Sequence, residues 1–211
     1  MLFHTWEFAV FFVVAYAGYL VPGYYSSCCG GKAATAQDAI GAHPYNDVPP
    51  LGGRDGADVC VEAPLYSWTI ERPRREVARR LSAYGKARNI EALAQYRDVE
   101  AVEIAEVNPH GRPRRYAVTL DRDTVVELDA EDLRRAVDYR QGSMRGPEQA
   151  LWSAYISATM SRRSVWFEGH GHGHGVGLCQ YGAEALAQRG ESCAQILRWY
   201  YPDVEITPTY T

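Results

Sequence analysis

Residues 102–128, VEIAEVNPHGRPRRYAVTLDRDTVVEL, decide the fold class. Apolar and polar side chains alternate over 102–105 and again over 116–120, and the turn sequence Asn-Pro-His-Gly lies between them at 108–111. This pattern is typical of a β-hairpin, and 124–128 continues it as a third strand. We therefore expect an antiparallel sheet in the middle of the chain.

Helix and strand signals flank this hairpin on both sides. Pro73 is placed where a helix begins, with Gly85 as its expected end, and Asp129 is placed to cap a helix after the third strand. We expect further strands at 66–70, 156–160 and 164–168, and further helices at 183–189 and from Ser192 to Tyr200. The order predicts an α+β fold, mostly antiparallel sheet with several short helices, and not the strict alternation of a parallel sheet.

Two segments among the first 64 residues stand out by composition: one is apolar, and the other is rich in loop-forming residues. Residues 8–21 are almost continuously apolar, but the run is shorter than the ~20 residues of a membrane span, and no Lys or Arg precedes it. We expect one or two buried strands there, with an export signal as the alternative and no membrane span. Residues 41–64 are rich in Gly, Pro and Asp, which predicts a long surface loop.

Composition limits the class of protein. The chain has 211 residues, 46% of them hydrophobic, and a net charge of −4. We therefore expect a single globular domain over 1–211 and no nucleic-acid partner, because phosphate binding needs a concentrated basic face. Five arginines do cluster early in the first long helix; we expect a solvated helix face, with an anionic wall surface as the alternative partner. They are Arg72, Arg74, Arg75, Arg79 and Arg80.

Residues 169–183, GHGHGHGVGLCQYGA, are the most distinctive stretch. If the segment is extended, His170, His172 and His174 share one face. Such a row of imidazoles could bind a metal, move protons or form the polar floor of a sugar site. The alternative is a turn in which the histidines satisfy backbone groups or are solvated.

Several segments together resemble one bacterial family. HGVGLCQYGA at 174–183, LAQRG at 186–190 and ILRWYYP at 196–202 resemble the C-terminal signature of the SpoIID/LytB family, the sporulation stage II protein D and amidase-enhancer proteins. YYSSCCGG at 24–31 resembles the serine-rich Gly-Gly turn of that family. The pieces occur in the family's order.

The resemblance implies a peptidoglycan protein of the cell envelope. Family members include lytic transglycosylases that cleave the bond between N-acetylmuramic acid and N-acetylglucosamine in glycan stripped of peptides. The alternative is a non-catalytic wall-glycan-binding or amidase-enhancing module. Expected partners are glycan strands and a cell-wall amidase. By this resemblance the substrate-binding residues are Ser27, His172, His174, Gln180 and Tyr181.

The sequence departs from the family at the catalytic acid. The Glu-Met-Pro motif that carries it is absent, and Glu7 has no Met-Pro after it. We therefore assign no catalytic residue, leave open whether the chain is an enzyme, and expect no release of anhydro-muropeptides. The chain is expected to be an incomplete SpoIID-like domain, either a fragment lacking its N-terminal part or a natural non-catalytic relative.

The cysteines offer one candidate metal site. Some members of the family hold a zinc near the serine-rich turn, and Cys29 stands directly before its Gly-Gly, with Cys60 as a second candidate ligand. No cofactor is required for the expected chemistry, but a structural zinc on Cys29 and Cys60 is one hypothesis. A Cys29–Cys60 disulfide and free thiols are the alternatives. Cys179 is interpreted as a small buried side chain.

Overall fold

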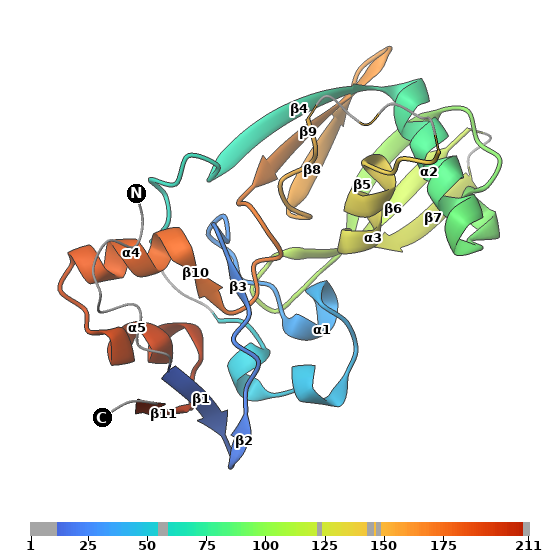
Figure 1. Cartoon of the computed structure of the whole chain (residues 1–211). Coiled ribbons are helices and arrows are strands. Elements are labelled where there is room, and N and C mark those ends of the chain that lie inside the picture. The colour runs from blue at the N-terminus through green and yellow to red at the C-terminus, as the bar shows by residue number, and fades with distance from the viewer. Residues whose placement is uncertain (1–11, 55–58, 122–123, 143–145, 147–148, 209–211) are drawn as a thin grey trace.

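The computed structural model shown in Figure 1 describes residues 12–54, 59–121, 124–142, 146 and 149–208. Its strands are β1 Phe12–Tyr16, β2 Tyr19–Leu20, β3 Tyr25–Ser26, β4 Ser67–Pro73, β5 Val99–Val107, β6 Pro113–Leu120, β7 Thr124–Asp129, β8 Ile156–Met160, β9 Ser164–His170, β10 Leu178–Cys179 and β11 Glu205–Pro208. Its helices are α1 Ala36–Ala39, α2 Arg74–Arg88, α3 Ala130–Val137, α4 Gln180–Gln188 and α5 Cys193–Tyr200, with the 3-10 turns η2 Pro44–Asn46, η3 Pro49–Leu51 and η4 Glu91–Leu93.

The strands form small sheets that are mostly antiparallel. The orders are β11-β1-β2, β4-β9-β8 and β5-β6-β7, and these sheets are antiparallel, whereas β3 and β10 form a parallel pair. This confirms the α+β class expected from the sequence.

The central hairpin has the expected register. Val118 of β6 lies between Val102 of β5 and Val126 of β7, and all three side chains are buried. The alternation in the sequence therefore places one apolar face of this sheet against the core. Helices α2 and α3 lie beside the sheet (Figure 1), and the Tyr116 hydroxyl donates to the carbonyls of Ala154 and Ile156, which ties β6 to the β8 region.

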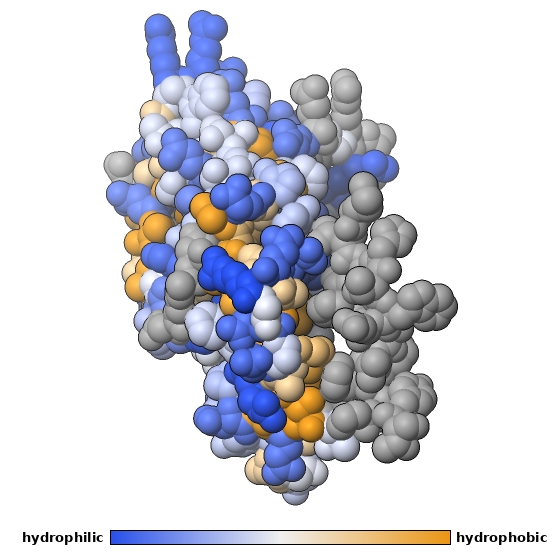
Figure 2. All heavy atoms as spheres, turned by 90° about the vertical axis from the view of Figure 1, so that its left-hand side faces the viewer, coloured by the Kyte–Doolittle hydropathy of each residue, from blue (hydrophilic) through white to orange (hydrophobic). Residues whose placement is uncertain are grey.

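The two ends of the described chain form a second lobe with its own hydrophobic core. β1 pairs with β11, so that Val14 lies opposite Ile206. Figure 1 shows α4, α5, β1 and β11 together, away from α2 and α3. Viewed from the α4–α5 side, the surface is largely hydrophilic with hydrophobic side chains scattered between (Figure 2).

Helix α2 runs further than expected. The prediction that it stops at Gly85 is wrong, because Gly85 is a buried helical residue and the helix continues to Arg88, with Asn89 as its C-cap at φ 57°. A Cβ on Gly85 would lie 2.5 Å from the Cβ of Leu93, so the glycine lets η4 pack against the helix. The glycine signal thus marks a close contact and not a helix end.

The segment 41–64 is not simply a surface loop. It contains η2 and η3, and it buries Leu51, Cys60 and Ala63 in the second core. Proline at the first positions of both 3-10 turns explains why the composition resembled a loop. Residues 55–58 of this segment lie outside the described residues.

The expectation for the apolar N-terminal run is confirmed in part. β1 is a strand in the second core, but Tyr19 and Leu20 of β2 are exposed, and residues 8–11 lie outside the described residues. Within the described ranges, no helix combines the length and the apolar character that crossing a membrane requires.

The C-terminal helices begin at local caps. α4 starts at Gln180, three residues before the expected position, because the Sγ of Cys179 accepts a hydrogen bond from the N–H of Gly182 at 3.4 Å. α5 starts after Ser192 as expected, with Gln195 completing a capping box. Strand β11 had no counterpart in the sequence prediction.

Candidate metal centre

Cysteines from three distant segments meet in the second core. Cys28 follows β3, Cys60 follows the loop after η3, and Cys179 ends β10. Their three sulfur atoms lie within 4.8 Å of one another, and all three residues are buried. The sulfur of Cys29 lies 3.6 Å from that of Cys60, and Cys28 lies 3.5 Å from Cys60. We call Cys28, Cys29, Cys60 and Cys179 the thiol cluster.

The glycine-histidine segment fixes the backbone that carries two of these thiols. Cys28 and His172 form a β-bridge, in which the N–H of His172 donates to the carbonyl of Cys28 at 2.8 Å. A Cβ on Gly171 would lie 2.5 Å from that carbonyl oxygen, and Gly171 has φ 78°. Only glycine allows both the conformation and this close approach. The repeat therefore holds the backbone of Cys28 in place through residues that are not themselves part of the thiol cluster.

Backbone N–H groups point at one sulfur. The N–H groups of Cys29 and Gly182 both donate to the Sγ of Cys179 at 3.4 Å. Gly182 lies in the first turn of α4, where amide groups lack helical acceptors. Such donors favour a thiolate, but the hydrogen bond with Cys28, together with burial, raises the pKa of Cys179.

The thiols shift one another's pKa values in opposite directions. Hydrogen bonds from Cys179, Cys28 and Cys29 hold the pKa of Cys60 well below its usual range. Hydrogen bonds to Cys179 and Cys60, together with burial, raise the pKa of Cys29. The four thiols therefore titrate as one interacting group.

The donor set fits a soft metal ion. Sulfurs bound to a tetrahedral zinc are about 3.8 Å apart; Cys28, Cys60 and Cys179 form the group whose sulfurs all lie within 4.8 Å of one another, and Cys29 approaches it through Cys60 at 3.6 Å. The buried hydroxyl of Tyr200 makes no hydrogen bond within the described part of the chain. A Cβ on Gly182 would touch that hydroxyl and also lie 3.4 Å from the sulfur of Cys179, so only glycine fits between Tyr200 and the thiol cluster. The cluster could hold a metal.

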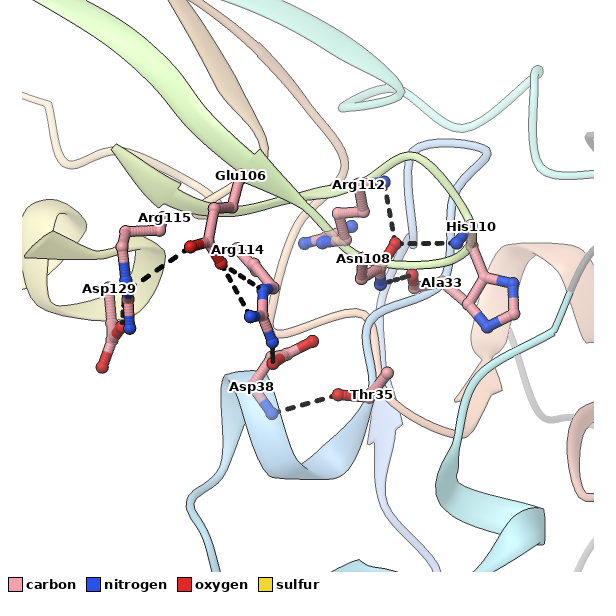
Figure 3. A network of polar contacts seen from close by, with 10 residues as sticks. All are labelled: Ala33, Thr35, Asp38, Glu106, Asn108, His110, Arg112, Arg114, Arg115 and Asp129. Atoms are coloured by element: carbon pink, nitrogen blue, oxygen red, sulfur yellow. Dashed lines mark hydrogen bonds and ion pairs between the residues drawn. The ribbon is translucent and has the colours of Figure 1, made fainter. Parts of the chain in front are cut away.

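The turn between β5 and β6 connects this centre to the larger core. The amide of Asn108 donates to the carbonyl of Ala33 at 2.9 Å, while its oxygen accepts from the N–H groups of His110 and Arg112 (Figure 3). The buried guanidinium of Arg112 donates to the carbonyl of Cys29 at 2.8 Å. Burial lowers the pKa of Arg112.

The three repeat histidines do not share one face. Gly171, Gly173 and Gly175 have φ values of 78°, 106° and 79°, so the backbone kinks and is not extended. The rings instead contact different partners: His170 lies 4.8 Å from Tyr155, His172 lies 5.0 Å from Trp152 and His174 lies 6.2 Å from Tyr24, between ring centroids. Among the described residues, no histidine belongs to a group with metal-ligand spacing.

The other expected binding residues lie around the thiol cluster. Ser27 precedes Cys28, and its carbonyl accepts from the N–H of Tyr181 at 3.1 Å. Gln180 and Tyr181 open α4 and are half-buried. The structure thus brings Tyr181 to Ser27, and the bridge between His172 and Cys28 places His172 next to the same turn.

Sequence reasoning named Cys29 and Cys60 as candidate ligands but missed Cys28 and Cys179. All five cysteines are free thiols in the structure. The adjacent Cys28 and Cys29 indicate a metal or thiol site, but the neighbouring sequence does not show that both of them contact Cys60. Cys179 is separated from Cys28 by about 150 positions, and only the pairing of β3 with β10 brings them together.

Comparison with known proteins assigns a family. The sequence profile of the family described as Domain of unknown function (DUF8618) matches residues 54–177, more than half of the chain, and the protein belongs to this family. An uncharacterized protein, BHWA1_00569 of Brachyspira hyodysenteriae (strain ATCC 49526 / WA1), is 25% identical over 194 residues. That similarity covers 92% of this chain and 45% of the relative, so the chain spans less than half of the relative's length.

The resemblance to the SpoIID/LytB family is therefore wrong as an assignment, because the family that matches is a different one. Its signature was read from short segments rich in glycine and small residues. The structure shows that positive φ angles and close backbone contacts require several of those glycines, so local geometry contributes to the pattern. The expectations of a peptidoglycan substrate, an amidase partner and an envelope location stay predictions.

Proposed function

We propose that the protein is a zinc-binding domain in which Cys28, Cys29, Cys60 and Cys179 hold one structural zinc ion. The convergence of buried sulfurs carries the proposal: three lie within 4.8 Å of one another, and the fourth lies 3.6 Å from Cys60.

A metal explains the arrangement better than a disulfide does. Cys28 and Cys29 compete for the same partner, at 3.5 Å and 3.6 Å from the sulfur of Cys60. One disulfide would use two sulfurs and leave two buried thiols, whereas a tetrahedral cation uses all four. Thiolate ligands favour zinc, copper(I) or iron–sulfur clusters; we propose one mononuclear zinc, with Cys28, Cys60 and Cys179 within 4.8 Å of one another and Cys29 as the fourth ligand.

The ion would act as a cross-link. Four protein ligands leave no open coordination position, so the site is structural and not catalytic. The ligands come from the β3 turn, the loop after η3 and the start of α4, which are otherwise joined by hydrogen bonds and apolar contacts. A bound zinc ion would neutralise the negative charge of the thiolates.

Elemental analysis and native mass spectrometry of the chain purified without chelator test this proposal. We expect one zinc ion per chain, and a Cys60→Ser variant that retains little of it. Cys193→Ser is the matched control, since Cys193 is outside the thiol cluster. Wild-type protein that stays metal-free after refolding with zinc, or a Cys60→Ser variant that keeps full zinc, would contradict the proposal.

A second proposed function is binding of carbohydrate, with peptidoglycan glycan strands as the ligand. The supporting observation is a set of half-buried rings along the repeat, in which Trp152 contacts His172 and Tyr155 contacts His170. The Nζ of Lys32 lies 5.8 Å from the centre of the Tyr155 ring. Ring faces beside polar donors are suited to sugars.

Retention on purified sacculi tests the second proposal. We expect Trp152→Ala and His172→Ala to reduce the bound fraction at least fivefold relative to wild type. His43→Ala is the matched control, because His43 is exposed on η2's N-cap and away from these rings. Equal retention of all three variants would count against carbohydrate binding at this surface.

A further inference from the structure

We propose that a cleft between α2 and the segment from η4 to β5 binds a compact ligand carrying two or three linked phosphoryl groups. The cleft has a volume of about 470 Å³. Its charged lining consists of Arg75, Arg79, Lys86 and Arg97, and Tyr96 and Gln141 lie beside them. The site is on the other core from the thiol cluster, and the inference does not depend on the proposed zinc or carbohydrate function.

The cleft concentrates positive charge in a protein whose net charge is −4. None of the residues that line it is acidic. Within the described part of the chain, no ion pair involves Arg75, Arg79, Lys86 or Arg97. A multiply charged anion would supply the missing negative charge.

The neighbouring arginines of α2 behave differently. Arg74 pairs with Asp98 at 2.9 Å, and Arg80 pairs with Glu76 at 2.7 Å. Arg72 is buried and lies 3.9 Å from Asp138. The early arginine cluster is therefore two groups: one neutralised by carboxylates, and one exposed pair, Arg75 and Arg79, directed to the cleft.

Helical spacing aligns the cations of α2. Arg75 and Arg79 are four residues apart, and Lys86 follows seven residues later, so they share one face of the helix. Arg97 approaches from the facing segment, so that the anion would be held from two sides.

The cleft is preformed. The hydroxyl of Ser82 contacts the carbonyls of Leu93 and Tyr96 at 3.1 Å, and the N–H of Tyr96 contacts the same hydroxyl oxygen at 3.3 Å. These contacts fix the segment carrying Tyr96 and Arg97 against α2. A guanidinium presents two parallel N–H donors that match phosphate oxygens, and three guanidinium groups with one ammonium suit a charge of about −3 to −4.

Isothermal titration with sodium tripolyphosphate at low salt tests the inference. We expect one site per chain, affinity that falls as salt rises, and weaker binding of orthophosphate. Arg79→Gln and Arg97→Gln should each weaken tripolyphosphate binding at least tenfold. Both side chains are exposed, so the variants should keep the wild-type circular dichroism spectrum.

Arg189→Gln is the matched control. Arg189 is exposed at the C-cap of α4, so this substitution removes the same charge outside the cleft. Binding by this variant should equal that of wild type. The inference is overturned by no binding at millimolar tripolyphosphate, by equal losses in all three variants, or by tighter, Arg79-dependent binding of a DNA duplex, which would indicate an extended polyanion instead.

Discussion

The guanidinium of Arg112 donates to the backbone carbonyl of Cys29 across 2.8 Å, which links the β5–β6 turn to the thiol cluster. The same nitrogen donates to the carbonyl of Lys32 at 3.0 Å, and the guanidinium carbon lies 5.2 Å from the centre of the Tyr155 ring. Arg112 lies inside the region that defines the family, whereas Cys29 lies outside it. This contact therefore couples the two cores.

Arg112→Met should destabilise the fold because it removes a buried guanidinium that donates to the carbonyls of Cys29 and Lys32. We expect the free energy of unfolding to fall by about 3 kcal/mol, measured by urea denaturation. Arg114→Met is the control: Arg114 is 45% exposed in its ion pair with Glu106, so its loss should cost about 1 kcal/mol or less. Equal losses in the two variants would show that Arg112 does not couple the cores.

Removing the proposed zinc should lower the thermal stability. A ligand that binds only the folded state at a thousand times its dissociation constant stabilises by about 4 kcal/mol. We expect a chelator to lower the Tm of wild-type protein, and zinc to restore it. The Cys60→Ser variant should melt at the same temperature with and without chelator, because Cys60 is the thiol that both Cys28 and Cys29 contact. A chelator-insensitive wild type would argue against a structural metal.

Gly177→Ala should be far more disruptive than an alanine at another glycine with positive φ. Gly177 has φ 65°, and an added Cβ would collide with the carbonyl of Tyr24 and lie 2.9 Å from the hydroxyl of Tyr201. We expect a loss above about 2 kcal/mol from strain and overpacking. Gly190 has φ 90° but open space around it, so Gly190→Ala should cost only about 1 kcal/mol. Chemical denaturation of both variants measures the difference, and similar costs would contradict the steric argument.

Local signals made much of the fold predictable. The β5–β7 strands were readable from alternation, and α5 from the Ser192 cap, because each depends on residues a few positions apart. Gly85 misled the prediction of α2, since its role is contact with Leu93, a tertiary effect that no neighbouring residue shows.

The candidate centre was only half predictable for the same reason. Cys29 and Cys60 could be named, but the sulfur of Cys179 joins them through the parallel pairing of β10 with β3. For the histidine repeat, the sequence pattern predicted an arrangement that the structure does not have. Its spacing indicated one shared face, yet the glycines between the histidines adopt positive φ and turn the rings toward different partners. A two-residue period predicts a face only where the backbone is extended.

His174 should make the stability of the fold depend on pH. Its Nδ1 accepts a hydrogen bond from the N–H of Val176 at 3.0 Å, and burial lowers its pKa from the ordinary value of 6.5. The folded chain therefore binds this proton less readily than the unfolded chain does. Stability is fully present above pH 6.5 and is lost as the pH falls through the lower, folded-state pKa.

The test compares urea unfolding at pH 7.5 and pH 5.5. His174→Gln should reduce the loss of stability on acidification, because glutamine can still accept a hydrogen bond but does not titrate. His43→Gln is the control: His43 is exposed, and its replacement should leave the wild-type dependence on pH in place. If His174→Gln and wild type lose the same stability between the two pH values, the acid sensitivity comes from other groups. That result would contradict the prediction that the fold disfavours protonation of His174.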